Sequence, residues 1–313
     1  MSAPLPLPDP APDPAPWPWP PLLQASVAVH AGAAALALAP GGWPWALGAV
    51  LANQAVLTAA GLWPRSTLLG PNIRQLPPAG AARSAIAITL DDGPDPEVTP
   101  AVLDQLEAAG AKATFFCIAA RAAAHPALVR EIVRRGHSVQ NHSHVHRHHF
   151  ALLGPSGFAA EIGRAQAVLA DLTGRMPHCF RAPAGLRNPL LDPVLHRLDL
   201  HLVSWTRRGF DTRDADPARV LQRLTKHLSA GDILLLHDGH ARQGVSGGPV
   251  ILEVLPRLLL RLHEHGLSPV SLDSALPRRH ATPPPGGNGN AHEDGSEGRT
   301  RGPAPRTGRM AHR

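Results

Sequence analysis

The stretch that decides the fold reads Ile86-Ala87-Ile88-Thr89-Leu90-Asp91-Asp92-Gly93-Pro94-Asp95-Pro96. Its apolar first half, rich in β-branched residues, predicts a buried strand, and Gly93-Pro94 ends that strand sharply. Two adjacent carboxylates therefore stand where a strand emerges, the edge at which α/β folds build their sites. Carboxylates brought together repel unless a cation lies between them or they have separate tasks. An Asx-type turn before Gly-Pro is the alternative interpretation of Asp91 and Asp92.

Length and charge limit the possible functions. The chain has 313 residues, enough for about two domains with a sizeable core. Its formal charge is +6, but from Arg278 onward seven arginines against three acidic residues leave +4, so the remainder carries only about +2. The basic balance is a property of the tail and indicates no nucleic-acid partner. Cys117 and Cys179 lie among apolar residues, which favours buried free thiols over a disulfide.

The first 63 residues differ in composition from the rest. Residues 1–20 are Pro-rich and predict an extended arm. Within residues 21–63, two uncharged apolar stretches flank Pro40-Gly41-Gly42, and each is close to the roughly 20 residues that span a bilayer. Five of the six tryptophans lie at the ends of these stretches, as expected at membrane interfaces. A signal peptide has Lys or Arg before its apolar segment, and no such residue precedes these stretches. A two-helix transmembrane hairpin is predicted, with a buried hairpin of a soluble protein as the alternative.

Arginines occur after the hairpin but none precedes it. Arg65, Arg74 and Arg83 are the first Lys or Arg residues of the chain, so the positive-inside rule favours a cytoplasmic location for the residues C-terminal to the hairpin. Three arginines leave the membrane side of these residues open. Residues 64–83 contain four prolines and are interpreted as a linker. The Gly-, Pro- and Arg-rich residues 278–313 are interpreted as a disordered basic tail.

Between these segments, at residues 84–277, strand-like and helix-like stretches alternate. Strands are predicted at 85–90, 113–118, 137–140, 179–180, 200–205, 233–236 and 269–272. Helices are predicted at about 99–109, 126–135, 157–173, 216–228 and 250–265. Thr99 and Asp216 are the expected N-caps of the first and fourth helices, each followed by proline. This alternation predicts a parallel sheet, either open or closed into a barrel.

Histidines follow the third predicted strand. His142 and His146 stand four apart on a turn or helix, a spacing that can present both imidazoles to one ion. Two neutral nitrogens and one carboxylate form a ligand set for a catalytic divalent metal. The chain holds 19 histidines, so such a pair also arises by chance, and the position after a strand is what favours the metal. His144, His148 and His149 are interpreted as surface or cleft residues.

Later strand ends carry further chemistry. Arg181 opens an Arg-Ala-Pro-Ala-Gly turn and could hold a carboxylate or an anionic substrate, with an ordinary loop as the alternative. Asp211 follows Trp205, and a surface aspartate is its alternative interpretation. His237 ends the apolar run Leu234-Leu235-Leu236, a position suited to a general acid or base.

Taken in order, these pieces resemble the polysaccharide deacetylases, the catalytic domain of carbohydrate esterase family four. The five family motifs correspond to Thr89-Leu90-Asp91-Asp92-Gly93, His142-Ser143-x-x-His146, Arg181-x-Pro183-x-Gly185, a Trp205-to-Asp211 segment and Leu235-x-His237. The resemblance covers about residues 84–275, and five motifs in order are highly specific. We therefore expect the catalytic domain at residues 84–277.

The resemblance implies an α/β fold, a distorted (β/α) barrel of about seven parallel strands, preceded by the hairpin. Three residues would hold a divalent metal ion, usually zinc: Asp92, His142 and His146. Asp91 would be the base that deprotonates a water, and Arg181 would position it. His237 would protonate the leaving amine, oriented by Asp211. Amide hydrolysis needs an activated water, stabilisation of the oxyanion and a proton for a poor leaving group, and this set supplies all three.

Two departures from the family pattern matter. Ala184 stands where the family often has Tyr, so a backbone N–H contact would be kept and the cleft would be more open. The fourth motif usually reads Asp-x-x-Asp-Trp, and only Asp211, followed by Thr212, matches it here. The chain has no Tyr, so a sugar must stack on Trp205, Phe210, a histidine or nothing aromatic.

The expected function is removal of N-acetyl groups from the amino sugars of a glycan or glycoconjugate, by a metal-dependent hydrolase at a bacterial-type inner membrane. Deacylation or deformylation of a lipid-linked sugar at the inner membrane face is the nearest alternative. A catalytically inactive, membrane-anchored glycan-binding module is the alternative of another class, and the intact motif residues oppose it.

Overall fold

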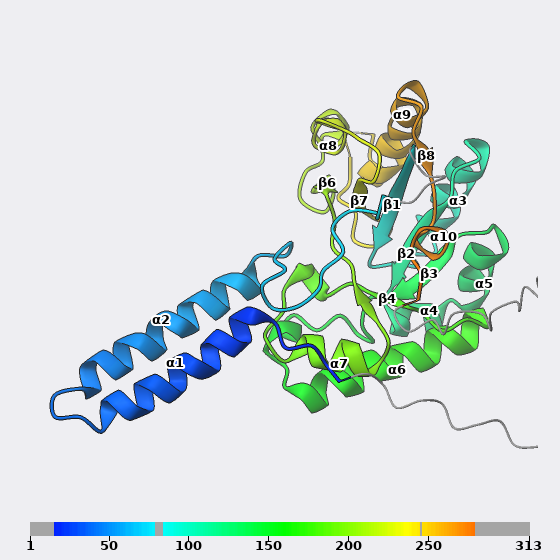
Figure 1. The fold of residues 1–313 in the computed structure, drawn as a ribbon. Helices are drawn as coiled ribbons and strands as arrows, with labels where there is room; N and C mark the ends of the chain where they lie inside the picture. The colour runs from blue at the N-terminus through cyan, green and yellow to red at the C-terminus, as the bar shows by residue number, and fades with distance from the viewer. Residues whose placement is uncertain (1–15, 79–83, 245, 279–313) are drawn as a thin grey trace, which may run out of the picture. The chain divides into compact units, whose positions relative to one another are not determined.

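A curved parallel sheet forms the centre of the domain that follows the hairpin (Figure 1). The computed structural model describes residues 16–78, 84–244 and 246–278. The strands are β1 (Ala85–Asp91), β2 (Ala113–Cys117), β3 (Ser138–Asn141), β4 (Cys179–Phe180), β5 (His201–Leu202), β6 (Arg207–Arg208), β7 (Ile233–His237) and β8 (Ser268–Pro269). Seven of them run in the order β5-β4-β3-β2-β1-β7-β6, and β8 pairs with β1 off this path. All these pairings are parallel, so the carboxyl ends of the strands share one edge.

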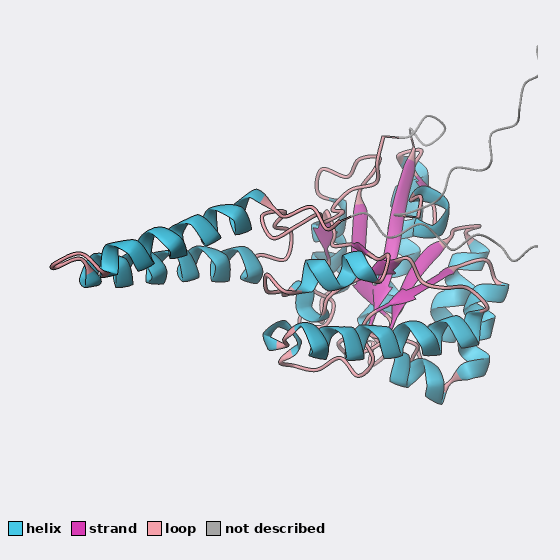
Figure 2. Cartoon of the chain, turned by 60° about the horizontal axis from the view of Figure 1, so that its bottom comes forward, coloured by secondary structure: helices cyan, strands magenta, loops and turns pink. Residues whose placement is uncertain are grey.

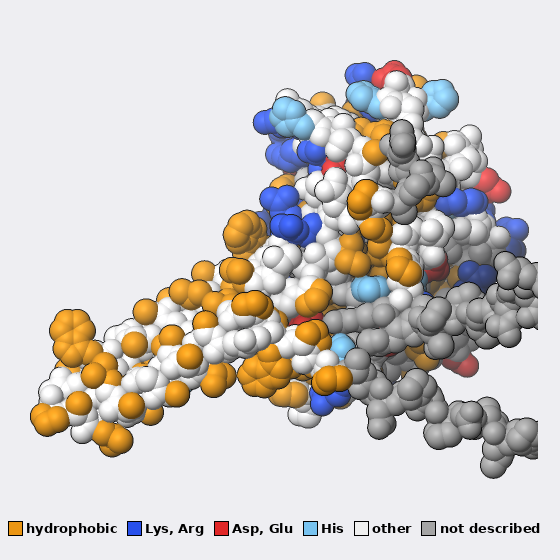
Figure 3. Space-filling model, viewed as in Figure 1, with side chains coloured by type: hydrophobic (Ala, Val, Ile, Leu, Met, Phe, Trp, Pro, Cys, Tyr) orange, Lys and Arg blue, Asp and Glu red, His pale blue; other side chains and the backbone are white. Residues whose placement is uncertain are grey.

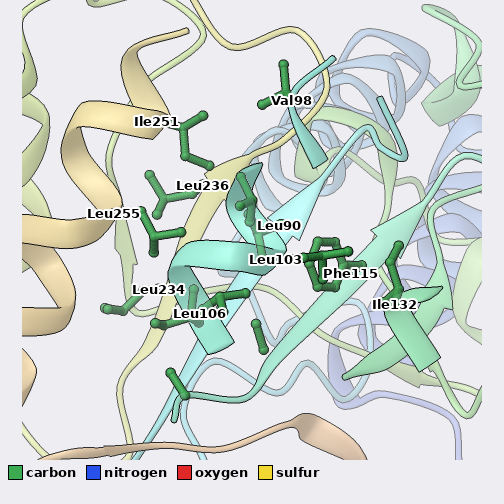
Figure 4. Packing of buried hydrophobic residues seen from close by; sticks show 14 of the residues in the cluster. Leu90, Val98, Leu103, Leu106, Phe115, Ile132, Leu234, Leu236, Ile251 and Leu255 are labelled. Atoms are coloured by element: carbon green, nitrogen blue, oxygen red, sulfur yellow. The ribbon is translucent and has the colours of Figure 1, made fainter. Parts of the chain in front are cut away.

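Strand β1 lies in the middle of the sheet because both of its faces are apolar. Its large side chains Ile86, Ile88 and Leu90 pack in the main core with helices α3 (Thr99–Ala108) and α9 (Val250–Glu264) (Figure 4). Its small residues Ala85 and Ala87 alternate with them and belong to a second buried cluster on the opposite face. Burial of each Leu- or Ile-sized side chain stabilises the fold by about 1.5–3 kcal/mol, which anchors β1 and the residues at its end.

Helices connect the strands and pack beside the sheet (Figure 2). Besides α3 and α9 they are α4 (Ala119–Ala124), α5 (Pro126–Arg134), α6 (Pro155–Thr173), α7 (Leu191–Arg197), α8 (Pro217–Thr225) and α10 (Leu272–Ala275), with short 3-10 turns η1 (Phe150–Leu152) and η2 (Pro183–Gly185). The predicted alternation and the parallel sheet of about seven strands are therefore confirmed. The described residues show no ladder between the end strands β5 and β6, so the barrel is an open, curled one. Cys117 and Cys179 are buried free thiols, as predicted.

Several local predictions were wrong. The strand predicted at 200–205 is only the two residues of β5. Arg207 and Arg208, outside the predicted strands, form β6, because they pair with β7. The strand predicted at 269–272 divides into β8 and α10. Thr99 is not an N-cap, because helix α3 already includes it and its hydroxyl donates to Asp238. The cap at Asp216 is confirmed, since its carboxylate accepts from two backbone N–H groups of α8.

The two helices expected before the domain are present as α1 (Pro21–Ala37) and α2 (Trp43–Leu62), which lie side by side (Figure 1). Gly41, with φ 70°, lies in the tight turn between them. Asn53 Nδ2 donates to Ser26 Oγ at 2.9 Å across the helix pair, so these polar groups are satisfied inside the hairpin. Among the described helices, α2 alone is long and apolar enough to cross a bilayer by length and composition, with a mean hydropathy of 1.4.

The hairpin carries most of the exposed apolar surface of the described chain (Figure 3). Of the 19 large hydrophobic side chains that are exposed in the described residues, 13 lie between Trp19 and Leu68. They include Trp43 and Trp45, which are 65% and 74% exposed. Such a surface differs from that of a hairpin buried in a soluble core.

The segment expected to be a linker is described as far as residue 78 and packs on the domain. Ile73 bridges to Val203 and Gln75 to Asp232. The arm is described only from residue 16, and residues 279–313 of the expected tail lie outside the described residues.

Candidate active site

The predicted site residues meet at the carboxyl edge of the sheet. Asp91 ends β1 and Asp92 follows it, while His237 ends the neighbouring strand β7, opposite Asp91 in the ladder. The loop of residues 142–149, here called the histidine loop, follows β3, and Arg181 follows β4. Parallel α/β proteins place their chemistry at this edge.

Asp92, His142 and His146 bring their ligand atoms together. Oδ1 of Asp92 lies 3.3 Å from Nε2 of His142 and 3.3 Å from Nε2 of His146. Ligands about 2.1 Å from a tetrahedral ion lie about 3.4 Å apart, so these three atoms fit the ligand shell of one small divalent ion such as zinc. Oδ1 of Asp92 is also buried without a hydrogen-bond partner. Both the donor set and the unpaired oxygen fit a metal ion.

Backbone turns aim these side chains at one point. Asp92 has a left-handed φ of 71°, so it departs from the strand alternation that would direct it away from Asp91. Ser143 and His146 also have positive φ values, 67° and 54°, and Ser143 Oγ accepts from the His146 backbone N–H at 3.0 Å. The loop therefore turns back until His146 stands beside His142.

The electrostatics of the cluster favour a cation. Burial and the neighbouring His142 lower the pKa of His146 to about 4, so its imidazole is neutral at neutral pH. Burial alone would raise the pKa of Asp92, but the close contact with His142 and the charges of the nearby histidines lower it, so the carboxylate is ionised. Burial alone would lower the pKa of His142, but the charges of Asp91 and Asp92 raise it. Positive charge is therefore stabilised here, whether a proton or a bound cation supplies it.

A backbone carbonyl on the side of the ring away from Asp92 fixes the tautomer of His142. Its Nδ1 donates to the backbone carbonyl of Arg181 at 2.8 Å. Nε2 is then the nitrogen directed at Asp92, as in metal sites where the second ring nitrogen of a histidine is fixed by a carbonyl.

Arg181 is fully buried and holds Asp91. Its Nη1 donates to Asp91 Oδ1 at 2.7 Å and to Thr89 Oγ1 at 2.8 Å, and its other nitrogens donate to two backbone carbonyls. Removing one partner of a buried ion pair costs about 3–5 kcal/mol, so this contact fixes the carboxylate firmly. The second oxygen of Asp91, Oδ2, lies 3.9 Å from Nε2 of His142 and thus faces the ligand cluster.

Asp211 holds His237 through both of its oxygens. Oδ1 accepts from His237 Nδ1 at 2.8 Å, and Oδ2 accepts from the His237 backbone N–H at 2.7 Å. Burial alone would lower the pKa of His237, but the charge and hydrogen bond of Asp211, with smaller effects of Asp91 and Asp92, raise it. The histidine can therefore hold a second proton, on Nε2, up to a higher pH than an ordinary histidine.

The structure gives the exposure of Ala184, one of the two departures from the motif pattern, and of the two aromatic candidates for sugar stacking. Ala184 is exposed within the turn η2, with a left-handed φ of 55°, so no ring covers the cleft at this position. Trp205 is only 7% exposed and is excluded as a stacking platform for a sugar. Phe210 is 39% exposed, and the guanidinium of Arg208 lies 4.9 Å from its ring.

Three residues near the site were not singled out from the sequence. Asp238, directly after His237, is buried and accepts from Thr99 Oγ1 at 2.6 Å. Arg121 and His240 contact Asp92 from the side away from the histidine cluster. Position after a motif residue could have indicated Asp238, whereas Arg121 carries no local signal.

The sequence of this chain is similar to those of known proteins. The family model for polysaccharide deacetylase matches residues 79–203. A chitooligosaccharide deacetylase of Azorhizobium caulinodans is 36% identical over 163 residues, which cover 50% of this chain and 75% of that protein. A peptidoglycan-N-acetylglucosamine deacetylase of Bacillus cereus is 31% identical over 206 residues, 62% of this chain and 89% of that protein.

A solved structure extends the comparison to three dimensions. The family 4 carbohydrate esterase from Streptomyces lividans, solved in complex with acetate, aligns with a TM-score of 0.55 and 31% identity. The alignment covers 62% of this chain and 96% of that one. The shared part therefore corresponds to nearly the whole of that chain.

Proposed function

The chain belongs to the polysaccharide deacetylase family, carbohydrate esterase family four, and from this premise we propose that it is a metal-dependent N-deacetylase of acetylated amino sugars in a glycan or glycoconjugate. Its relatives are hydrolases of carbon–nitrogen bonds outside peptides, and so is this chain. The observation that carries the proposal is the convergence of Asp92, His142 and His146 beside two separately held groups, Asp91 and His237.

Three side chains would hold the metal ion, for which zinc is the first candidate: Asp92, His142 and His146. When bound, the ion would polarise the acetyl carbonyl and lower the pKa of a water. The remaining steps belong to side chains of this chain, and each has a defined atom.

Asp91 is the base. Arg181 occupies its Oδ1, so Oδ2, which faces the ligand cluster, accepts the proton of the attacking water. Arg181 also prevents the carboxylate from rotating, because its guanidinium is buried and bonded on every nitrogen. The water oxygen then bonds to the acetyl carbon.

His237 is the acid. Its Nδ1 is occupied by Asp211, so the proton for the leaving group comes from Nε2. As the carbon–nitrogen bond breaks, the sugar nitrogen takes that proton and leaves as an amine, while the acetyl group leaves as acetate. Without this proton an amine is a poor leaving group, so the acid matters more for amides than for activated esters.

The hairpin is proposed to anchor the enzyme in a bacterial-type inner membrane. Helix α2 has 20 residues, which at about 1.5 Å each reach about 30 Å, the thickness of a hydrocarbon core. The exposed apolar side chains between residues 19 and 68 support the same placement. The arginines at 65, 74 and 83 favour a cytoplasmic catalytic domain.

Contacts between the hairpin and the loop after Arg181 favour a second candidate function, removal of an acyl or formyl group from a lipid-linked sugar. The backbone N–H of Arg187 donates to the carbonyl of Gly61 in α2 at 3.2 Å. A Cβ on Gly185 would lie 2.7 Å from Cβ of Pro64, so the loop after Arg181 packs on the end of α2. A sugar carried on a membrane lipid could reach a cleft in this place.

One experiment distinguishes these functions. The zinc-loaded full chain in detergent is offered acetylated chitooligosaccharides, peptidoglycan fragments and lipid-linked N-acetyl and N-formyl amino sugars, and released acetate and formate are measured. Acetate from soluble glycans supports the main proposal, and release confined to lipid-linked sugars supports the second. Binding of glycans without release from any substrate would instead indicate an inactive glycan-binding module.

A further inference from the structure

Asp92 is contacted by two side chains that the mechanism above does not use, Arg121 at its backbone carbonyl and His240 at its carboxylate. Arg121, on helix α4, donates from Nη1 to the backbone carbonyl of Asp92 at 2.9 Å. Its Nη2 lies 2.7 Å from Nε2 of His240, and Nδ1 of His240 lies 3.3 Å from Asp92 Oδ2. Oδ1 of Asp92 faces the two histidines, so the two oxygens of one carboxylate face different partners.

The donor inventory fixes the direction of each hydrogen bond. A guanidinium has only donors, so Nε2 of His240 must accept from Arg121. The ring proton of His240 is then on Nδ1, which donates to Asp92 Oδ2. Arg121 thus holds His240 in the one neutral tautomer that can support the carboxylate.

The backbone around these residues leaves room for the contacts. A Cβ on Gly239 would lie 2.4 Å from the carbonyl oxygen of Asp92 and 2.6 Å from Nη1 of Arg121, so only glycine fits between them. His240 has a left-handed φ of 64°, which turns its ring back toward Asp92.

Helix α4 also contacts the loop that carries the other two ligands. The backbone N–H groups of Ala119 and Ala120 donate to the carbonyls of Ser143 and His144, at 3.1 and 2.9 Å. The same helix therefore bonds the histidine loop through its first residues and Asp92 through Arg121. Because α4 bonds both segments, this one helix fixes the distances between the ligand atom of Asp92 and those of His142 and His146.

We propose that Arg121 and His240 form a clamp that positions Asp92 for the metal ion, and that α4 is the support that joins this clamp to the histidine loop. The proposal rests on the metal site of the proposed function. Both are positioning residues, since they act through Asp92. Loss of such outer partners typically lowers metal affinity about 10- to 100-fold.

The test measures zinc affinity of the metal-free full chain in detergent, by competition with a chromophoric chelator, with no substrate present. His240→Ala and Arg121→Met are each expected to weaken binding by about 10- to 100-fold. The double variant should be little weaker than Arg121→Met alone, because the two residues act as one chain of bonds. His240→Gln should recover affinity, since an amide can accept from Arg121 and donate to Asp92.

His148→Ala is the matched control, because it removes an exposed histidine of the histidine loop that lies outside the proposed ligand set. The side chain of His240 is 56% exposed, so its removal should leave the thermal unfolding temperature of the metal-free protein unchanged. Zinc affinity of His240→Ala within twofold of the wild type would overturn the clamp. Complete loss of zinc in His240→Ala with full retention in Arg121→Met would make His240 a ligand and overturn its positioning role. Failure of the wild type to bind zinc would overturn the metal site, and the clamp with it.

Discussion

Replacement of Asp211 by Asn tests how the fold prepares His237 to act as an acid. The wild-type carboxylate accepts two buried hydrogen bonds, from His237 Nδ1 at 2.8 Å and from the backbone N–H at 2.7 Å. An amide has one oxygen and a pair of N–H donors, so it can accept only one of these bonds in the same place. It also lacks the negative charge that raises the pKa of His237.

The size of the effect depends on the type of bond that is lost. A hydrogen bond to a charged group contributes about 1.5–3 kcal/mol, and about 1.4 kcal/mol corresponds to one pH unit in a pKa. The pKa of His237 in Asp211→Asn should therefore fall by about one to two pH units. Asp91 and Asp92 raise the pKa of His237 less than Asp211 does, and a bound metal ion would oppose their effect, so Asp211 is the main group that stabilises the protonated histidine.

The direction of the pH effect depends on which protonation state of His237 is active. His237 must be protonated to give its proton, so activity is lost as the pH rises through its pKa. A lower pKa of His237 moves the alkaline limb of kcat/KM toward lower pH, by the same one to two units, and leaves the acid limb in place. Acetate release measured between pH 5 and pH 10, with metal content determined in parallel, reports both limbs.

A matched control is Asp171→Asn, which neutralises an exposed aspartate on α6. Its pH profile should equal that of the wild type. An alkaline limb that stays unchanged in folded, metal-loaded Asp211→Asn would refute the reasoning, because the limb would then belong to another group. Loss of metal in this variant would equally refute it, by placing Asp211 among the ligands.

Further predictions concern the other groups and the hairpin. The double variant His142→Ala, His146→Ala should bind no stoichiometric zinc by elemental analysis, and retained zinc would place the metal elsewhere. Asp91→Asn should keep its zinc but lose about 10²- to 10⁴-fold in turnover. Loss of zinc in this variant would instead make Asp91 the metal ligand and Asp92 the base. His237→Ala should lose about 10²- to 10⁴-fold on an amide and less on an activated acetate ester, with equal losses arguing for a binding role. Residues 22–63 should hold the chain in membranes through carbonate washing, and full release into the soluble fraction would contradict the anchor.

The central part of the fold could be predicted because its strands are long enough to show their pattern. β1, β2 and β7 each have five or more buried residues in a row, which is typical of a strand in a parallel sheet. β5, β6 and β8 have only two residues each, too few for any periodicity, and their pairing partners make them strands. Helix α4 was missed for a similar reason, since six residues that are mostly alanine show no apolar stripe.

The identity of the site residues could be predicted from the sequence, but the direction in which their side chains point could not. Spacing and position after a strand indicated His142 and His146 among 19 histidines. Nothing in the sequence required Asp92 to adopt a φ of 71°, and without this turn adjacent carboxylates on a strand would point in opposite directions. Trp205 and Phe210 were equal candidates for stacking, and only burial separates them, at 7% and 39% exposed.

Arg121 and His240, which support Asp92, could not be predicted from the sequence, whereas the motif residues could. Both facts have the same physical reason. A ligand or a base must sit at the end of a particular strand, so its position relative to that strand is fixed and forms a short local pattern. A residue that supports it needs only to reach it from any neighbouring element. Arg121 and His240 meet although 119 positions separate them in the chain, and a different helix could supply the same donor from a different place. The support of a site is therefore a property of the packed fold, whereas its chemistry is a property of the strand ends.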